Sequence, residues 1–174
     1  MTTTRTALST IIVLISLVVA TSSSLCAAEG LPIPSGRVIL TISGKILAKN
    51  VGDTAQFDRP MLESLGMSKI VTSNPWYKEP VSFEGVSLER LMQVVGASGS
   101  SVVAVALNDY TTEIPREDIS RFGPILALKR DSEYMSVRDK GPLFIIYPFD
   151  EKPELKSQLY YGRSAWQVFK LVVK

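Results

Sequence analysis

Three short segments of the sequence bring aromatic rings together with amide, hydroxyl and charged groups. They span residues 72–77, 108–110 and 160–166, and the candidate binding residues in them are Ser73, Asn74, Trp76, Asn108, Asp109, Tyr110, Arg163, Ser164 and Trp166. An indole ring stacks on a flat heterocycle, while amides, carboxylates and guanidinium groups bond to its edges. The composition therefore permits a site for a flat ligand, although tryptophans at the edge of a core and ordinary asparagine turns would explain the same residues.

Catalytic chemistry has few side chains available. The chain contains no histidine and a single cysteine, Cys26, which excludes a Ser-His-Asp triad, a Cys-His dyad and an HExxH zinc site. No spacing pairs two carboxylates for acid–base work, and neither Ser73 nor Ser164 begins an SxxK motif. With 19 Lys+Arg against 17 Asp+Glu, the net charge of +2 also excludes a strongly basic surface for nucleic acid.

The first 28 residues have the layout of a secretory signal peptide. Arg5 precedes an apolar run at residues 11–20, and Cys26 and Ala28 supply the small residues of a cleavage site. The run is shorter than the roughly 20 apolar residues that span a bilayer. We therefore expect cleavage after Ala28 and an exported mature domain at residues 29–174, with a retained membrane anchor as the alternative.

The candidate residues lie near the ends of segments that favour short strands and helices. Apolar or alternating runs predict strands at 38–42, 45–48, 69–73, 102–107, 110–114, 125–129, 133–136, 143–147 and 167–173, the first two joined by a turn at residues 43 and 44. Helices are predicted at 59–65, after Ser87, at 116–122 and at 153–159. Because strands dominate and do not alternate regularly with helices, we predict one α+β domain with a mixed or antiparallel sheet and few short helices.

Six stretches, taken in order, resemble the sulfite-oxidase-type molybdopterin-binding domain. They are KIVTSNPW, FEGVSLERLMQVVGA, VALNDYTTEIP, ILALKRDSEYMS, KGPLFIIYPFD and YYGRSAWQVFKLVV. Residues 108–110 (Asn-Asp-Tyr) stand at the Asp-Gly-Tyr turn of that family, and residues 163–166 (Arg-Ser-Ala-Trp) stand at its terminal Ser-x-Lys-Trp motif. The resemblance runs from about Val38 to Lys174 and implies the same α+β fold with a pterin pocket.

The sequence departs from this family at the metal ligand. In the enzymes a cysteine thiolate ligates molybdenum in a Cys-x-x-Asn-like motif, whereas this sequence has Val71-Thr72-Ser73-Asn74 at that place. A hydroxyl has a far higher pKa than a thiol and is a poor substitute ligand. The arginine of the family's GPLR motif is also replaced, by Phe144. We therefore expect no catalytic residues, no metal site and no molybdenum; an oxidoreductase with an oxygen ligand at Ser73 is the enzymatic alternative.

Short, exported chains of this kind without the cysteine resemble periplasmic pterin-binding regulators. The resemblance implies a reduced pterin or a molybdopterin-like compound as ligand, and as partner the periplasmic part of a membrane protein that makes or degrades cyclic-di-GMP. Trp76 or Trp166 would stack on the pterin, and Asn74, Asp109 and Arg163 would bond to its edge or side chain. We expect Asp109 to accept two parallel N–H bonds from the N–C–N edge. A module that binds only protein is a third hypothesis.

Overall fold

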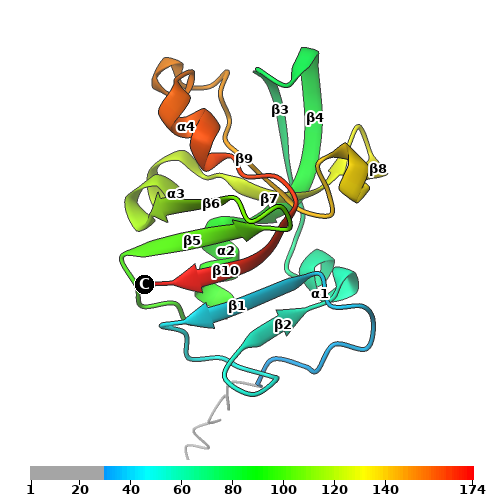
Figure 1. The fold of residues 1–174 in the computed structure, drawn as a ribbon, viewed down its shortest axis with the longest axis vertical. Coiled ribbons are helices and arrows are strands. Elements are labelled where there is room, and N and C mark those ends of the chain that lie inside the picture. The colour runs from blue at the N-terminus through cyan, green and yellow to red at the C-terminus, as the bar shows by residue number, and fades with distance from the viewer. Residues whose placement is uncertain (1–29) are drawn as a thin grey trace, which may run out of the picture.

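The computed structural model describes residues 30–174, and the signal peptide expected at residues 1–28 lies outside this part of the chain. Within it, ten strands and four α-helices form an α+β domain with two sheets, which confirms the predicted fold class (Figure 1). No helix among the described residues is long and apolar enough to cross a membrane.

The first sheet is mixed and has the strand order β2-β1-β10-β5-β6. The C-terminal strand β10 lies at its centre, parallel to β1 on one side and antiparallel to β5 on the other. The remaining pairs, β1 with β2 and β5 with β6, are antiparallel. The strands are β1 (Leu40–Gly44), β2 (Ala55–Phe57), β5 (Ser101–Ala106), β6 (Thr111–Pro115) and β10 (Val168–Val173).

The second sheet is antiparallel and buried on both faces near its centre. Its strands are β3 (Ser68–Asn74), β4 (Tyr77–Ser87), β7 (Ile125–Arg130), β8 (Glu133–Tyr134) and β9 (Phe144–Ile146), with β8 and β9 both paired to β7. Ile145 faces the main core, whereas its neighbours Phe144 and Ile146 face a second cluster with Phe83. Burial on both faces explains why this segment of the sequence is a continuous apolar run rather than an alternating one.

Four short α-helices connect the strands, and two of them begin at the capping residues seen in the sequence. The helices are α1 (Arg59–Ser64), α2 (Leu88–Val94), α3 (Arg116–Phe122) and α4 (Gln158–Arg163), with 3₁₀ turns η1 (Val137–Asp139) and η2 (Pro153–Leu155). Asp58 Oδ1 accepts a hydrogen bond from Met61 N (3.0 Å) at the start of α1. Ser87 Oγ accepts one from Arg90 N (3.4 Å) at the start of α2. The helix predicted at 153–159 is instead split between η2 and α4.

Two predictions about strands were wrong. Residues 45–48 do not form a strand, because the backbone N–H groups of Leu47 and Ala48 both donate to Val95 O (2.9 and 3.1 Å) at the end of α2. The supposed turn at residues 43 and 44 belongs to β1. Strand β4 was missed because Lys78, Glu79 and Pro80 interrupt any apolar pattern; β7 pairs with β4 only from Phe83 onward, so the proline is tolerated.

Candidate functional site

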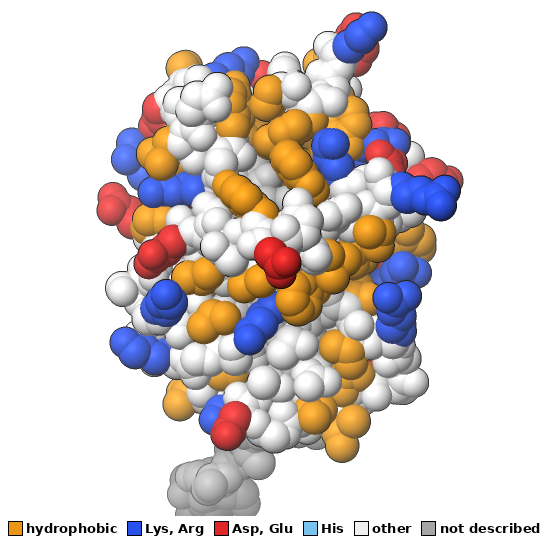
Figure 2. All heavy atoms as spheres, viewed as in Figure 1, with side chains coloured by type: hydrophobic (Ala, Val, Ile, Leu, Met, Phe, Trp, Pro, Cys, Tyr) orange, Lys and Arg blue, Asp and Glu red, His pale blue; other side chains and the backbone are white. Residues whose placement is uncertain are grey.

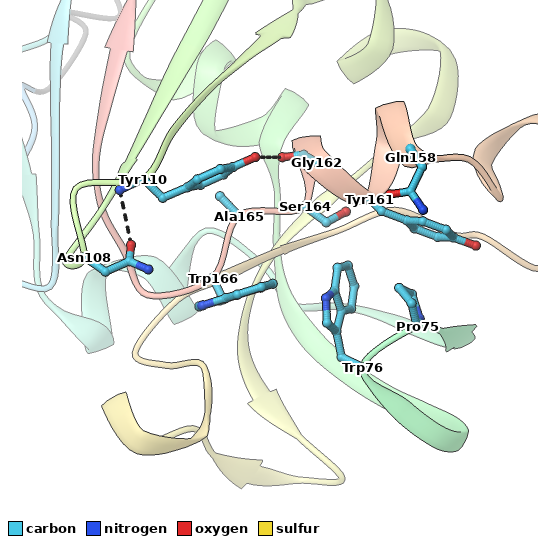
Figure 3. Close-up of a pocket in the computed structure, with 10 residues that line it drawn as sticks. All are labelled: Pro75, Trp76, Asn108, Tyr110, Gln158, Tyr161, Gly162, Ser164, Ala165 and Trp166. Carbon is cyan, nitrogen blue, oxygen red and sulfur yellow. Dashed lines mark hydrogen bonds between the residues drawn. The ribbon is translucent and has the colours of Figure 1, made fainter.

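A cavity of about 410 Å³ lies where four parts of the fold meet: the β3–β4 turn, the β5–β6 turn, α4 and the approach to β10. Figure 1 shows α4 and the β3–β4 hairpin at the same end of the molecule. The lining residues are Pro75, Trp76, Asn108, Tyr110, Gln158, Tyr161, Gly162, Ser164, Ala165 and Trp166 (Figure 3). The three segments singled out in the sequence therefore converge on one cavity, which we call the aromatic pocket.

Aromatic rings form one side of the aromatic pocket. The ring of Trp76 makes edge-to-face contacts with Trp166 (centroids 5.7 Å apart), Tyr161 (6.1 Å) and Phe144 (5.2 Å). Trp166 also packs edge-to-face on Phe144 at 6.1 Å. Both tryptophans are half-buried, so they serve as core and as pocket wall together. The structure therefore places both tryptophans at the edge of the core and in the lining of the cavity.

The polar groups of the aromatic pocket are uncharged. Asn108 and Tyr110 lie on one side, Pro75, Trp76, Gln158 and Tyr161 on the other, and Trp166 between them (Figure 3). Asn108 Oδ1 accepts a hydrogen bond from Tyr110 N (3.2 Å), which leaves its NH₂ group as the donor it can offer to a ligand. The hydroxyl of the buried Ser164 donates to Tyr160 O (2.9 Å) and can still accept. Such a lining suits a neutral ligand with donors and acceptors on its rim.

Two hydrogen bonds hold the walls of the aromatic pocket in place. The hydroxyl of Tyr110 donates to Gly162 O (2.7 Å) and so joins the β5–β6 turn to α4. Asn74 Oδ1 accepts from Trp76 N (3.1 Å), and this Asx turn sets the position of the tryptophan. Asn74 is therefore a positioning residue rather than part of the lining, which differs from its expected contact with the ligand.

The structure does not place Asp109 in the lining. Asp109 has φ 63° in the turn between β5 and β6, and its N–H donates to Ala106 O (3.1 Å). The side chain is exposed at the tip of this turn, while its neighbours Asn108 and Tyr110 line the pocket. The expected pairing of its carboxylate with the N–C–N edge of a ligand is not supported by this position.

Arg163 is also outside the lining, because it serves an internal ion pair. Its guanidinium donates to Asp118 Oδ2 (NH1 to Oδ2, 2.6 Å), and the two side chains are 18% and 9% exposed. The hydroxyl of Tyr147 donates to the same oxygen at 3.2 Å. Burial, and then the negative charge of Asp118, raise the pKa of Tyr147 far above its usual value, so this phenol stays protonated. Arg163 thus ties α4 to α3 instead of facing a ligand.

Ser73 belongs to a separate surface cluster. Its hydroxyl donates to the two carboxylate oxygens of Asp150 (3.0 and 2.8 Å), and its N–H donates to one of them (2.6 Å). Lys156 Nζ lies 2.7 Å from the same carboxylate. The hydrogen bond from Lys156, followed by those from Ser73, lowers the pKa of Asp150 to about 2. This cluster fastens the end of β3 to the segment before α4.

Five lining residues were not among those predicted. Pro75, Tyr161, Gly162 and Ala165 lie inside two of the segments singled out, but only their neighbours were named as candidates. Gln158 gave no signal, since its place in the pocket depends on the break between η2 and α4. No group of three or more His, Cys, Asp or Glu side chains among residues 30–174 is arranged to hold a metal ion.

The two-sheet architecture is a sulfite-oxidase-like α+β fold. The chain is similar to the crystal structure of the sulfane dehydrogenase SoxCD from Paracoccus pantotrophus, with a TM-score of 0.55 and 13% sequence identity. The similarity covers 77% of this chain and 37% of that one, and at this identity it shows the fold alone. No protein-family model and no curated protein sequence matches the chain.

Proposed function

We propose that the chain is a periplasmic, non-enzymatic pterin-binding protein that regulates a membrane signalling partner. The aromatic pocket supports the proposal that the chain binds a pterin. The pocket has a volume of about 410 Å³, its walls include indole and phenol rings, and its lining contains amides and no charged side chain. Its volume falls within the roughly 300–1,000 Å³ of typical small-molecule sites. A pterin is flat and neutral, and its rim carries neighbouring donors and acceptors that amide groups can match.

The regulatory part rests on the sequence resemblance described above. A protein that binds a pterin in the periplasm without converting it would report on the ligand by acting on the periplasmic part of a membrane protein that makes or degrades cyclic-di-GMP. The fold neighbour is an enzyme by its name, and it neither supports nor opposes this regulatory role. Deleting the gene should change cellular cyclic-di-GMP only when the pterin supply is intact.

The enzymatic alternative is a molybdopterin oxidoreductase in which Ser73 ligates the metal. The surroundings of Ser73 do not fit that role, because its hydroxyl donates to a carboxylate of low pKa (Oγ to Asp150 Oδ2, 2.8 Å). A negative charge at this distance opposes loss of the hydroxyl proton, which a ligand to molybdenum requires. Elemental analysis of the purified protein should therefore find molybdenum well below one equivalent; stoichiometric metal with sulfite turnover would favour the enzyme.

The binding proposal is tested by calorimetry with tetrahydrobiopterin as the probe. Trp166→Ala should weaken binding by roughly 5- to 150-fold, the range expected for losing one stacked ring. Trp166→Phe keeps a ring against Phe144 and should lose less. Leu47→Ala removes an exposed apolar side chain that does not line the aromatic pocket and is the control.

Two further measurements separate the outcomes. Thermal melts of each variant show whether a loss of affinity reflects a loss of folding. Mass spectrometry of small molecules released from protein made in its native periplasm identifies the ligand. If the parent and both Trp166 variants bind with equal affinity, or none binds, the pterin proposal fails and a module that binds only protein becomes the better interpretation.

A further inference from the structure

A second cavity, of about 790 Å³, opens between β10, α1 and the segment around β8. Among the described residues, twelve large hydrophobic side chains are exposed, and five of them line this one cavity: Val38, Leu107, Tyr134, Val137 and Phe169. Their exposed fractions lie between 37% and 49%. Figure 2 shows apolar side chains gathered across the middle of the face on which β10 lies. We call this hollow the β10 groove; such a concentration of exposed apolar groups marks an interaction site.

Phe169 reaches the β10 groove because β10 carries a bulge. Val168 pairs with Ala106 and Lys170 pairs with Val105, so Phe169 has no partner on β5. A bulge adds an unpaired residue to one strand and redirects its side chain, and bulges often lie beside functional sites. The position of Phe169 in the lining is thus set by the pairing of the central strand.

The lining of the β10 groove carries two arginines and two carboxylates, and of these four side chains only the carboxylates have hydrogen-bond partners within the described residues. Both carboxylates of the groove already accept hydrogen bonds within the chain. Asp58 accepts from the N–H groups of Met61, Gly36 and Ser35, and these hydrogen bonds, above all the one from Met61, lower the pKa of Asp58. Glu63 accepts from the hydroxyl of Tyr134 (2.6 Å). No salt bridge within the described residues engages the two arginines of the lining, Arg37 and Arg59, which are both exposed.

Two cationic groups also lie on the ring of Tyr134. The guanidinium of Arg59 lies 4.1 Å from the ring centroid, and the ammonium of Lys129 lies 4.7 Å from it. Both charges therefore lie beside the apolar lining. A ligand in the groove would meet apolar side chains and positive charge together.

We propose that the β10 groove binds an extended segment of a partner protein in which large apolar side chains are flanked by carboxylates. A second copy of this chain fits less well, because a two-fold contact would present the same exposed arginines, Arg37 and Arg59, on both sides of the interface. A membrane surface fits poorly as well, because the apolar side chains lie in a hollow that a flat bilayer does not enter. This proposal does not depend on what the aromatic pocket binds.

The test is selection of random short peptides on the full mature chain, followed by affinity measurement of the selected peptides. Peptides of the expected class carry large apolar residues flanked by Asp or Glu. Phe169→Ser and Leu107→Ser should each weaken them by about tenfold, as loss of a central apolar contact does. Arg37→Glu should weaken them too, and raising the salt concentration should lower the affinity for the parent chain.

Matched controls lie elsewhere on the surface. Leu47→Ser changes a leucine that is 83% exposed and outside both cavities, and Arg90→Glu reverses an exposed arginine outside the groove. Neither should alter peptide affinity. The proposal is overturned if no peptide depends on the groove, if the dependent peptides are basic, or if the groove variants instead abolish self-association or binding to vesicles of anionic phospholipid.

Discussion

At the scale of single residues, the oxygen of the Asn108 amide takes part in the fold and its NH₂ group is available to a ligand. Its oxygen accepts from Tyr110 N (3.2 Å) and its NH₂ group remains for the aromatic pocket. Asn108→Asp keeps the acceptor and removes the donor, so the turn should persist while affinity for a pterin falls by about 2- to 13-fold, the worth of one neutral hydrogen bond. Calorimetry with tetrahydrobiopterin, paired with a thermal melt, checks this.

The neighbouring carboxylate supplies the control for that variant. Asp109 is exposed outside the pocket lining, so Asp109→Asn should leave the affinity unchanged. An effect of Asp109→Asn as large as that of Asn108→Asp would show that the carboxylate, and not the amide, contacts the ligand.

Asp150 should make stability depend on pH in the acid range. Its pKa is lowered from 3.8 to about 2 in the folded chain, chiefly by the hydrogen bond from Lys156 and then by those from Ser73. The stabilisation is complete above pH 3.8 and is lost as the pH falls toward 2, because the unfolded chain takes up the proton first. The Asp150 side chain is 35% exposed, so solvent limits the contribution to about 1 kcal/mol at most.

Urea unfolding at pH 6 and at pH 2.5 measures this contribution. Asp150→Asn should lose less stability between the two pH values than the parent does. Asp53→Asn, which removes a fully exposed carboxylate, should follow the parent. Equal losses in the parent and in Asp150→Asn would contradict the assignment.

The residues of the candidate site show what sequence can and cannot locate. Trp76, Asn108, Tyr110, Ser164 and Trp166 were predicted from composition and order, and they line one cavity. For Arg163 the sequence shows a guanidinium group but not where it points, because its partner Asp118 lies 45 residues away in the chain. Direction is a property of tertiary packing, and no local pattern in one sequence encodes it.

At the scale of elements, Gly85 is required by the close contact of β4 and β7. A Cβ atom at this position would lie 2.1 Å from Leu126 O and 2.4 Å from the Cα of Ala127, both backbone atoms that cannot move aside. Gly85→Ala should therefore destabilise the fold by about 3 kcal/mol, as overpacking of a tight core does. Urea unfolding measures it; Gly30→Ala, where a Cβ meets nothing within 4 Å, should have no effect.

The ion pair between α3 and α4 gives the second prediction at this scale. Arg163→Met leaves Asp118 buried without its cation and should cost about 3 kcal/mol of unfolding free energy. Adding Asp118→Asn removes the stranded charge and should restore part of the loss. If the double variant is less stable than Arg163→Met, the pair is not the main link between these helices.

Helices and strands were predicted best where one buried face or one capping residue determines the element. The helix after Ser87 follows from Leu88, Leu91 and Met92, all of which are buried. The strand expected at 45–48 failed because its backbone hydrogen bonds go to the end of α2, a distant partner that local alternation does not reveal. The long β4 was missed because its polar start is held only by pairing with β3.

At the scale of the whole molecule, the aromatic pocket and the β10 groove share two segments. Leu107 lines the groove and Asn108 lines the pocket; Trp166 lines the pocket and Phe169 lines the groove. The segments are joined by a hydrogen bond from Leu107 N to Gln167 O (3.0 Å). A ligand that orders the residues of one cavity should therefore also order those of the other.

We accordingly expect a pterin to change the affinity of a groove-binding peptide, and the peptide to change that of the pterin by the same factor. Couplings of this kind typically amount to about 5- to 150-fold. Titrations of the peptide with and without saturating tetrahydrobiopterin measure the factor. A factor of one would show that the two cavities are independent, without bearing on whether either binds its own ligand.

The central position of β10 has a consequence for proteolysis. This strand joins β1 to β5, and Lys174 O accepts from Ser100 N (2.7 Å) just beyond its end. Without residues 168–173, β1 and β2 would be separated from β5 and β6 by an empty place in the sheet. A chain truncated before residue 168 should therefore be degraded rapidly by protease, whereas the chain that contains β10 resists.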